Sequence, residues 1–180
     1  MPGGTFYFTL VTAGRTPFLC NDRARPLLRS AIERCRAQWP FTIDCFVLMP
    51  DHFHTILTLP SGDTDYSKRL AWIKRTFTIG WLADGGAERA VTGAQHTARR
   101  RGVWQPRFWE HVVRSPDDRN RLFDYIHYNP VKHGYVKCPK DWPYSSFHRF
   151  VKEGYYDLNW CCGEDIPPPT WDDIKDILGE

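Results

Sequence analysis

Residues 46–60, FVLMPDHFHTILTLP, determine how the rest of the chain is interpreted, because they place two histidines inside an apolar, β-branched run. Successive side chains on a β-strand point to opposite faces, so His52 and His54 would share a face while Phe53 packs behind them. Two neutral imidazoles held side by side on a rigid element form a partial metal site. An isolated His-x-His pair is usually two ordinary histidines, so chemistry also requires a third ligand and a reacting group.

Strand-like and helix-like segments alternate around this stretch. The strand segments are rich in β-branched and aromatic residues, and the helix segments repeat their apolar residues at helical spacing behind a capping side chain. The expected strands are 5–11, 41–49, 52–59 and 103–114, the last interrupted early by a proline. The expected helices are 22–38, one starting at residue 64 or 65, one starting after Ser115, and a short one from about 141 to 151.

The helix that opens with Ser-Pro at 115–116 carries a second pair of polar residues. Tyr125 and Asn129 are one turn apart and point the same way as the helix's apolar stripe. Tyr128 points about 60° away from Tyr125, so one of the two tyrosines, not both, should face the site. Pro130 disfavours helical geometry at the residue before it, so we expect the helix to end or kink at Asn129.

These two pieces could face each other across a sheet. They would then supply two imidazoles and one amide oxygen to a divalent cation, with a phenol beside it. This set suits phosphodiester cleavage by a tyrosine nucleophile. A phenol with a pKa of about 10 is a poor nucleophile at neutral pH, so local positive charge or a base must assist it. Asp51 or Glu110 could orient a ligand histidine.

Length and cysteine usage limit the class of protein. A chain of 180 residues suits one domain with a proper core and a possible appendage. No stretch approaches the ~20 apolar residues of a membrane span, and the N-terminus lacks the pattern of a signal peptide. None of the six cysteines is in Cys-x-x-Cys spacing, which argues against a zinc site or a disulfide framework. We expect a soluble, intracellular protein with no membrane partner.

Positive charge is concentrated in the middle of the chain, where residues 64–150 carry 16 basic and 8 acidic side chains. Such a block predicts a polyanionic partner, with nucleic acid as the leading candidate and a solvated, Arg-rich surface as the alternative. Residues 84–102 are expected to form a mobile basic loop that tightens on a phosphate backbone. The side chains expected to contact phosphates are Lys68, Arg69, Lys74, Arg75, Arg99, Arg100, Arg101, Arg119, Arg121 and Lys132.

The C-terminal end has the opposite charge, with 2 basic and 8 acidic side chains in residues 151–180. We divide the chain into a domain of residues 1–152 and an acidic tail of residues 153–180. The tail is expected to fold back on the basic surface and to restrain activity, and its charge favours a monomer over a homodimer.

Three stretches, VLMPDHFHTIL, FDYIHYNPVKHGYV and DWPYSSF, occur in this order. Together they resemble the HUH single-tyrosine transposases, where U is a hydrophobic residue, and among these the REP-associated tyrosine transposases. The resemblance spans roughly residues 5–150. It implies an α+β, ferredoxin-like (RRM-like) fold with a central antiparallel sheet and helices packed on it. It also implies a bacterial, cytoplasmic protein that associates with the nucleoid when it is bound to DNA.

The resemblance further implies a reaction and a substrate. His52, His54 and Asn129 would bind Mg²⁺ or Mn²⁺, and Tyr125 would become linked to the 5′ side of the cut, leaving a free 3′-OH. Many relatives have glutamine where this chain has Asn129, whose shorter side chain reaches less far. The expected substrate is single-stranded DNA folded into an imperfect hairpin, the repetitive extragenic palindrome (REP), with a recognition sequence at its foot. The enzyme would nick and rejoin this DNA.

Two other functions are compatible with these residues. The chain could be a non-catalytic module that binds hairpin DNA or RNA, because the ferredoxin-like sheet is shared with RNA-binding domains. It could also initiate replication or plasmid transfer with the same chemistry, although such proteins are usually larger. Catalysis is favoured, because all four chemical positions hold competent residues. A covalent DNA adduct that disappears in Tyr125→Phe would separate an enzyme from a binding module.

Overall fold

The computed structural model describes residues 3–97, 100–163, 169–171 and 178. Residues 5–112 have the succession of a ferredoxin-like fold, in which two β-α-β units share one sheet. These elements are β1 (Thr5–Val11), α1 (Ala24–Gln38), β2 (Thr42–Leu48), β3 (His52–Thr58), α2 (Tyr66–Ala83) and β4 (Trp109–Val112). The others are the 3-10 turns Ala13–Arg15 and Pro139–Asp141 and the helices α3 (Gly93–Thr97), α4 (Pro116–Lys132) and α5 (Phe147–Lys152).

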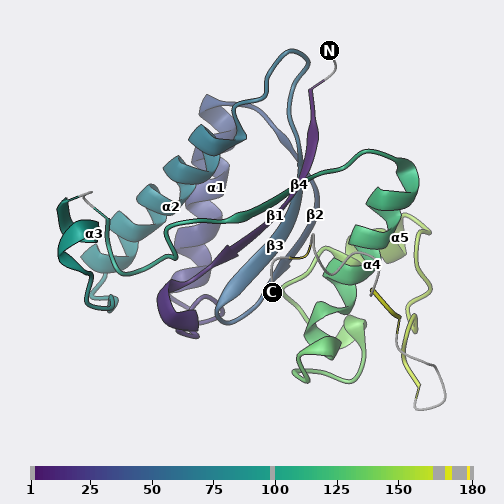
Figure 1. The fold of residues 1–180 in the computed structure, drawn as a ribbon. Helices are drawn as coiled ribbons and strands as arrows, with labels where there is room; N and C mark the ends of the chain where they lie inside the picture. Colours follow the sequence, from purple (N-terminus) through teal and green to yellow (C-terminus); the bar gives the residue numbers. More distant parts are fainter. Residues whose placement is uncertain (1–2, 98–99, 164–168, 172–177, 179–180) are drawn as a thin grey trace.

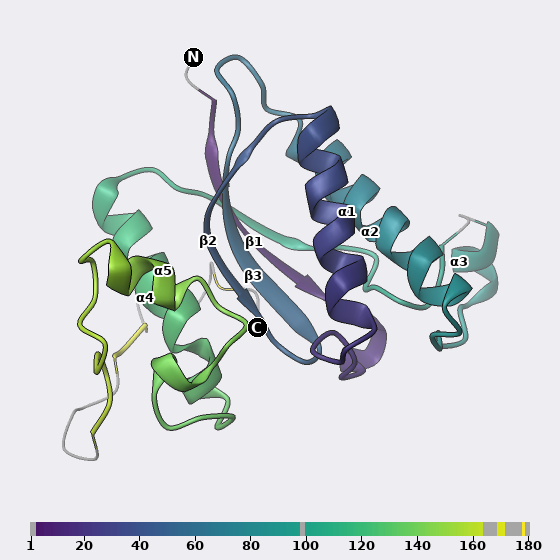
Figure 2. The same ribbon diagram turned by 180° about the vertical axis from the view of Figure 1, so that it is seen from behind.

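The four strands form one antiparallel sheet in the order β2-β3-β1-β4. Helices α1 and α2 cover one face of the sheet, and α4 and α5 lie on the other (Figure 1). The opposite view shows the same three layers (Figure 2). The expected α+β, ferredoxin-like architecture is therefore confirmed.

Both faces of the sheet are buried, and the alternation of side chains decides which residues meet which helices. Phe8 on β1 and Phe53 on β3 pack with α1 and α2, whereas Tyr7 and Ile56 pack with α4. His54 has the same parity as Ile56, so the two histidines of β3 face α4. The register places Thr9 of β1 directly opposite His54.

Side-chain caps explain where the three long helices begin. The Oδ1 atom of Asn21 accepts from the amide of Ala24 at 2.7 Å at the start of α1. Asp65 accepts from the amide of Lys68 at 3.1 Å at the start of α2. Ser115 accepts from the amide of Asp118 at 3.1 Å, with Pro116 at the first position of α4. Each cap satisfies amides that the helix itself cannot pair.

Two expected element boundaries are wrong, and in both cases the segment pairs with a strand. Residues 103–105 bond to residues 11–13 of the chain, and Pro106 then interrupts the pairing, so β4 begins at Trp109 rather than at residue 103. Residues 144–146 run along the open edge of β2, with Leu48 N donating to Tyr144 O at 2.8 Å. The last helix therefore begins at Phe147 instead of near residue 141.

The C-terminus of α4 also differs from the expectation. The helix continues through Pro130 to Lys132 instead of ending at Asn129. Proline removes one amide donor, but Pro130 is only two residues before the end of the helix, where the chain closes with other bonds. His133 N donates to Asn129 O at 3.0 Å, and Tyr135 N donates to Pro130 O at 2.9 Å. The continued turn therefore brings Lys132 and His133 to the side of α4 that faces the sheet, where they contact Tyr125 and His52.

A buried polar network holds α4 from its other side. His127 is fully buried, with Nε2 at 2.8 Å from Ser146 Oγ and 3.4 Å from Cys45 Sγ. Its Nδ1 atom lies 3.4 Å from the hydroxyl of Tyr156, which donates to Asp124 at 2.7 Å. The network joins α4 to β2 and to the segments around α5, and so fixes the helix relative to the sheet.

Acidification is expected to destabilise the protein through His127. Burial, followed by the charge of Arg149, lowers the pKa of His127 to about 3, whereas an unfolded histidine has a pKa of about 6.5. The unfolded state binds the proton first, so stability is complete above pH ~6.5 and falls by about 1.4 kcal/mol per pH unit towards the folded pKa. Urea denaturation should show a loss of ~2 kcal/mol in the free energy of unfolding between pH 7 and pH 5. His127→Gln should lose less over this interval, and equal losses would contradict the account.

In the described part of the chain, none of the helices combines the length and the apolar character needed to cross a membrane.

Candidate active site

The side chains of β3 and α4 that carry the candidate chemistry meet between the sheet and the helix. The rings of His52 and His54 lie 4.8 Å apart between centroids. The ring of Tyr125 lies 5.4 Å from that of His54, and the ring of His133 lies 5.4 Å from that of His52. His52, His54 and Tyr125 are all buried. The phenol and the paired imidazoles, which are far apart in the sequence, are therefore neighbours.

Asn129 lies between these two contacts along α4. Residues 125, 129 and 133 are each one turn apart, so their side chains share one side of the helix. The first contacts His54 and the last contacts His52. Asn129 is fully buried, and its place on this side of α4 lies between the residues that contact the two histidines.

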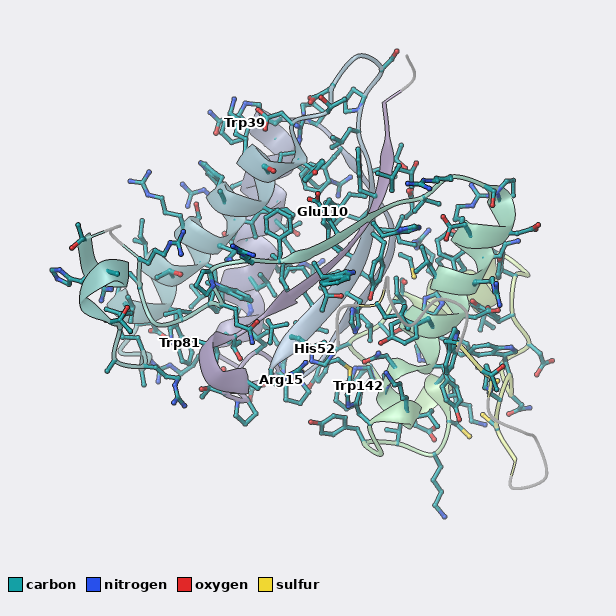
Figure 3. All side chains as sticks on the ribbon, in the orientation of Figure 1. Arg15, Trp39, His52, Trp81, Glu110 and Trp142 are labelled. Atoms are coloured by element: carbon teal, nitrogen blue, oxygen red, sulfur yellow. The ribbon has the colours of Figure 1, made fainter. Side chains whose placement is uncertain are left out.

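Hydrogen bonds fix the ring of His52. Its Nδ1 atom lies 2.6 Å from Asp51 Oδ1, and Asp51 Oδ2 accepts from Arg15 at 3.1 Å. Burial alone would raise the pKa of Asp51, but the bonds with His52 and Arg15 hold that pKa below its ordinary value. Figure 3 shows His52 beside Arg15 at one end of the sheet, with Glu110 well away from them. Of the two acids considered for this role, Asp51 has the contact, whereas Glu110 hydrogen-bonds Tyr66.

His54 is oriented by two hydroxyl groups of β1. Its Nδ1 atom lies 2.9 Å from both the Tyr7 hydroxyl and Thr9 Oγ1. Both hydroxyls donate to the carbonyl of Leu178, at 3.0 and 2.9 Å. The two hydroxyls also lie 2.9 Å from each other, so this polar cluster holds the ring of His54 by its Nδ1 atom. An imidazole held in this way is prepared to act as a ligand through Nε2.

The donor set fits a divalent cation. Both histidines bond through Nδ1, so Nε2 is the nitrogen that each would direct at a cation, and Asn129 would add an amide oxygen. Within the residues that the structure describes, no group of three or more His, Cys, Asp or Glu side chains could hold a metal ion. Among the described residues, the third protein ligand expected at this site is Asn129.

The two tyrosines of α4 have different surroundings. Tyr125 is fully buried against His54, and its hydroxyl accepts from Lys132 Nζ at 3.2 Å. Tyr128 is half-buried, and its ring lies 5.3 Å from that of Trp171. The ring of Trp171 also lies 5.4 Å from that of Tyr125. A residue of the acidic tail therefore covers the phenol that faces the histidines.

A basic groove with a volume of about 1200 Å³ lies between α2 and the loop before β4. It is on the α2 side of the sheet, whereas the histidines face α4 (Figure 1). Lys74 Nζ donates to the carbonyl of Gln105 at 2.6 Å, and burial, followed by the charge of Arg100, lowers the pKa of Lys74 to about 8. The charged residues that line the groove are Lys74, Arg75, Arg89, Arg100 and Arg101.

The chain is 40% identical to the REP-associated tyrosine transposase of Escherichia coli (strain K12) over 158 residues, which is 88% of this chain and 85% of the relative. It is also 40% identical to a REP-associated tyrosine transposase assigned in Haemophilus influenzae, over 91% of both chains. The chain belongs to the REP-associated tyrosine transposases. No family model matches it.

The fold of this REP-associated tyrosine transposase is also found in a solved relative. A REP-associated tyrosine transposase whose structure was determined bound to a REP hairpin superposes with a TM-score of 0.72 at 38% identity. The match covers 93% of this chain and 94% of the other. The chain is therefore a transposase enzyme, as its sequence motifs predicted.

One expected DNA contact of this transposase is wrong. Arg69 is buried, and its guanidinium donates to Asp63 at 2.5 Å and to the carbonyls of Asp65 and Pro40 at 2.9 and 3.2 Å. It links the end of α1 to the loop before α2, so it cannot reach a phosphate. The sequence did not reveal this burial, because Arg69 lies at the edge of the apolar face of α2. At such a position the helical spacing alone does not show whether a side chain is buried or exposed.

The other basic residues are spread over several surfaces. Arg99 lies outside the described residues, and Lys68 lies over the ring of Trp39 at 4.2 Å, away from the groove lining. Arg119 and Arg121 are exposed on the first half of α4. The groove therefore collects Lys74, Arg75, Arg100 and Arg101 from the expected set, and Arg101 pairs with Glu88.

Three residues near these sites were not identified from the sequence of this transposase. Arg89 lies within the basic loop and lines the groove. Its amide donates to Gly102 O at 2.9 Å, so the loop is tied at its base rather than free throughout. His133 lies one turn beyond Asn129, where the expected end of α4 concealed it. No pattern in the neighbouring sequence indicates that Trp171 covers Tyr125, because this contact depends on the path of the tail.

Proposed function

We propose that this transposase is a metal-dependent, sequence-specific endonuclease and strand transferase for single-stranded DNA that carries REP-type hairpins. Tyr125 is the nucleophile, and His52, His54 and Asn129 hold Mg²⁺ or Mn²⁺. The observation that carries the proposal is the contact of the Tyr125 ring with His54, 5.4 Å between centroids. Other support comes from the relative that was solved with a REP hairpin.

The reaction follows from the positions of the side chains. When bound, the divalent cation would polarise the scissile phosphate. The oxygen of Tyr125 attacks phosphorus, the bond from phosphorus to the 3′ oxygen breaks, and a phosphotyrosine on the 5′ side keeps the bond energy for rejoining. Asp51 holds the ring of His52, and Tyr7 and Thr9 hold that of His54, so both imidazoles keep their orientation during the reaction.

A denaturing-gel assay tests this function. A REP hairpin with a single-stranded foot is labelled at its 3′ end and incubated with the full chain and Mn²⁺. We expect a radiolabelled band at the mass of protein plus DNA, since the label stays on the fragment attached through its 5′ phosphate. Tight binding with no band would show a binding module instead. A band that still forms in the presence of EDTA would show that the reaction does not need a divalent metal ion.

The groove beside α2 is proposed to bind the phosphate backbone of the hairpin, because its lining is basic and it lies apart from the histidines. Charge reversal at Arg75 and Arg100 is expected to weaken hairpin binding by at least tenfold. It should also reduce the salt slope, which is the slope of the logarithm of the binding constant against the logarithm of salt concentration, by about 2 in magnitude. Fluorescence anisotropy at several salt concentrations measures both. Arg29→Glu on α1, at an exposed position outside the groove lining, is the matched control. Equal affinity and slope in the groove variant would exclude this surface.

Residues 1–152 are proposed as the catalytic domain and residues 153–180 as a cover that restrains it. The described part of this tail reaches the active site rather than the groove, because Trp171 lies on Tyr125 and Leu178 O accepts from Tyr7. The covered phenol is fully buried, so DNA can reach it only after the tail moves.

Removing residues 164–180 is expected to raise the nicking rate about tenfold. This is the increase expected if the state with Tyr125 uncovered rises from about a tenth of the molecules to nearly all of them. The cut falls after Gly163 because Tyr156 and Trp160 pack with α4 and α5. Single-turnover nicking measures the effect, and hairpin affinity and melting temperature are the controls. Trp171→Ala should give part of the increase. A truncated protein that is stable yet no faster would show that the tail does not restrain the reaction.

A further inference from the structure

Lys132 is the last residue of α4 and contacts the oxygen of Tyr125. Its Nζ atom donates to that oxygen at 3.2 Å and lies 4.9 Å from the centroid of the ring. The two residues are seven apart, which brings them back to within about 20° on the helix. Helical side chains lean towards the N-terminus, so Lys132 extends back along α4 towards Tyr125. The contact therefore follows from the continuation of the helix past Pro130.

The position of this ammonium group matches a requirement of the reaction. A phenol has a pKa of about 10, and the hydroxyl of Tyr125 is fully buried, where negative charge on oxygen is costly. His54 and Trp171 contact the ring of Tyr125. Lys132 instead contacts the oxygen that attacks, and a charge-assisted hydrogen bond is roughly twice as strong as a neutral one.

We propose that Lys132 is a further catalytic residue of this transposase, which stabilises the negative charge on the Tyr125 oxygen in both directions of the reaction. The inference rests on the proposed role of Tyr125 as nucleophile. In nicking, the phenolic oxygen forms a bond to phosphorus, its proton passes to solvent, and the departing 3′ oxygen takes a proton from water. In rejoining, the 3′-OH loses its proton to solvent, its oxygen attacks phosphorus, and the phenolic oxygen departs and is reprotonated. Lys132 keeps its three protons throughout.

This role differs from a phosphate contact, which the basic block alone suggests for Lys132. A lysine that binds a backbone phosphate contributes to affinity and to about one unit of the salt slope. A lysine that acts on the nucleophile contributes to the rates of the covalent steps and leaves affinity alone. The two roles therefore predict opposite outcomes for the same variant.

The test compares wild type with Lys132→Met, which keeps an unbranched side chain of similar length and removes its charge, and with Lys132→Arg. Single-turnover adduct formation and rejoining of the purified adduct are followed on denaturing gels with the full chain, a REP hairpin and Mn²⁺. For Lys132→Met we expect both rates to fall about 100-fold, the usual effect of removing one donor from a developing oxyanion. Hairpin affinity, salt slope and melting temperature should stay at wild-type values. Lys132→Arg should recover part of both rates.

Several results would overturn the proposal. They are a fall of less than tenfold in either rate for Lys132→Met, or a loss of hairpin affinity as large as the loss of rate. Failure of Lys132→Arg to recover any rate would also overturn it, because charge at this position would then not be what matters. If wild type itself forms no adduct, the proposed nucleophile fails first, and this outcome is visible in the control lane before any variant is compared.

Discussion

Tyr125→Phe is expected to lose covalent attachment to DNA completely, a fall on the order of 10³-fold or more in nicking rate. The substitution removes one oxygen atom from a fully buried ring, and the ring can keep its contacts with His54 and Trp171. The fold and hairpin affinity should therefore be preserved. The measurement is adduct formation on a denaturing gel together with hairpin affinity from anisotropy.

Tyr128→Phe is the matched control, since it makes the same chemical change three residues away on the same helix. The ring of Tyr128 packs against Trp160 and Trp171 rather than against a histidine. Adduct yield in this variant should stay within about twofold of wild type. If Tyr128→Phe lost the adduct and Tyr125→Phe kept it, the two tyrosines would exchange roles and the proposed geometry would be wrong.

His54→Ala is expected to remove both the metal and the reaction. It takes away one of the two proposed imidazole ligands, and the proposed donors that remain are one imidazole and one amide oxygen. Nicking should fall on the order of 10³-fold. Mn²⁺ affinity, measured by calorimetry on the protein without DNA, should fall by at least ~100-fold. Excess EDTA should stop wild-type nicking to the same extent.

Asp51→Asn gives a graded comparison for the metal site. It keeps a hydrogen-bonding group next to His52 Nδ1 but removes the negative charge that favours this ring orientation. We expect a 10- to 100-fold loss, roughly, in Mn²⁺ affinity. A His54→Ala protein that still binds Mn²⁺ like wild type would place the metal elsewhere in the molecule.

The sequence was sufficient for the parts of the fold that depend on local patterns. Alternation along residues 52–58 put both histidines on one face, and the spacing of Tyr125 and Asn129 put the phenol and the amide on one side of α4. The caps at Asp65 and Ser115 also have the expected partners. These features are set by the periods of a strand and a helix, which a single sequence displays.

Features that depend on contacts between distant segments were not predictable. Residues 144–146 look like the beginning of a helix, but the open edge of β2 pairs with them. Arg69 looks like a surface charge, but Asp63 and two carbonyl groups bury it. Pro130 indicated a helix end, although the turn after it is held by other bonds. This error concealed His133, and it concealed that Lys132, expected only as a phosphate contact, lies on the same side of α4 as Tyr125.

The central claim is that Tyr125, and no other residue, forms the bond to DNA beside the two histidines of β3. Peptide mapping of the covalent adduct tests it most directly. Trypsin releases residues 122–132, LFDYIHYNPVK, which contain both tyrosines of α4, so fragmentation of this peptide must locate the added nucleotide mass. We expect the mass on Tyr125 alone. A nucleotide on Tyr128, or on a residue outside this peptide, would contradict it.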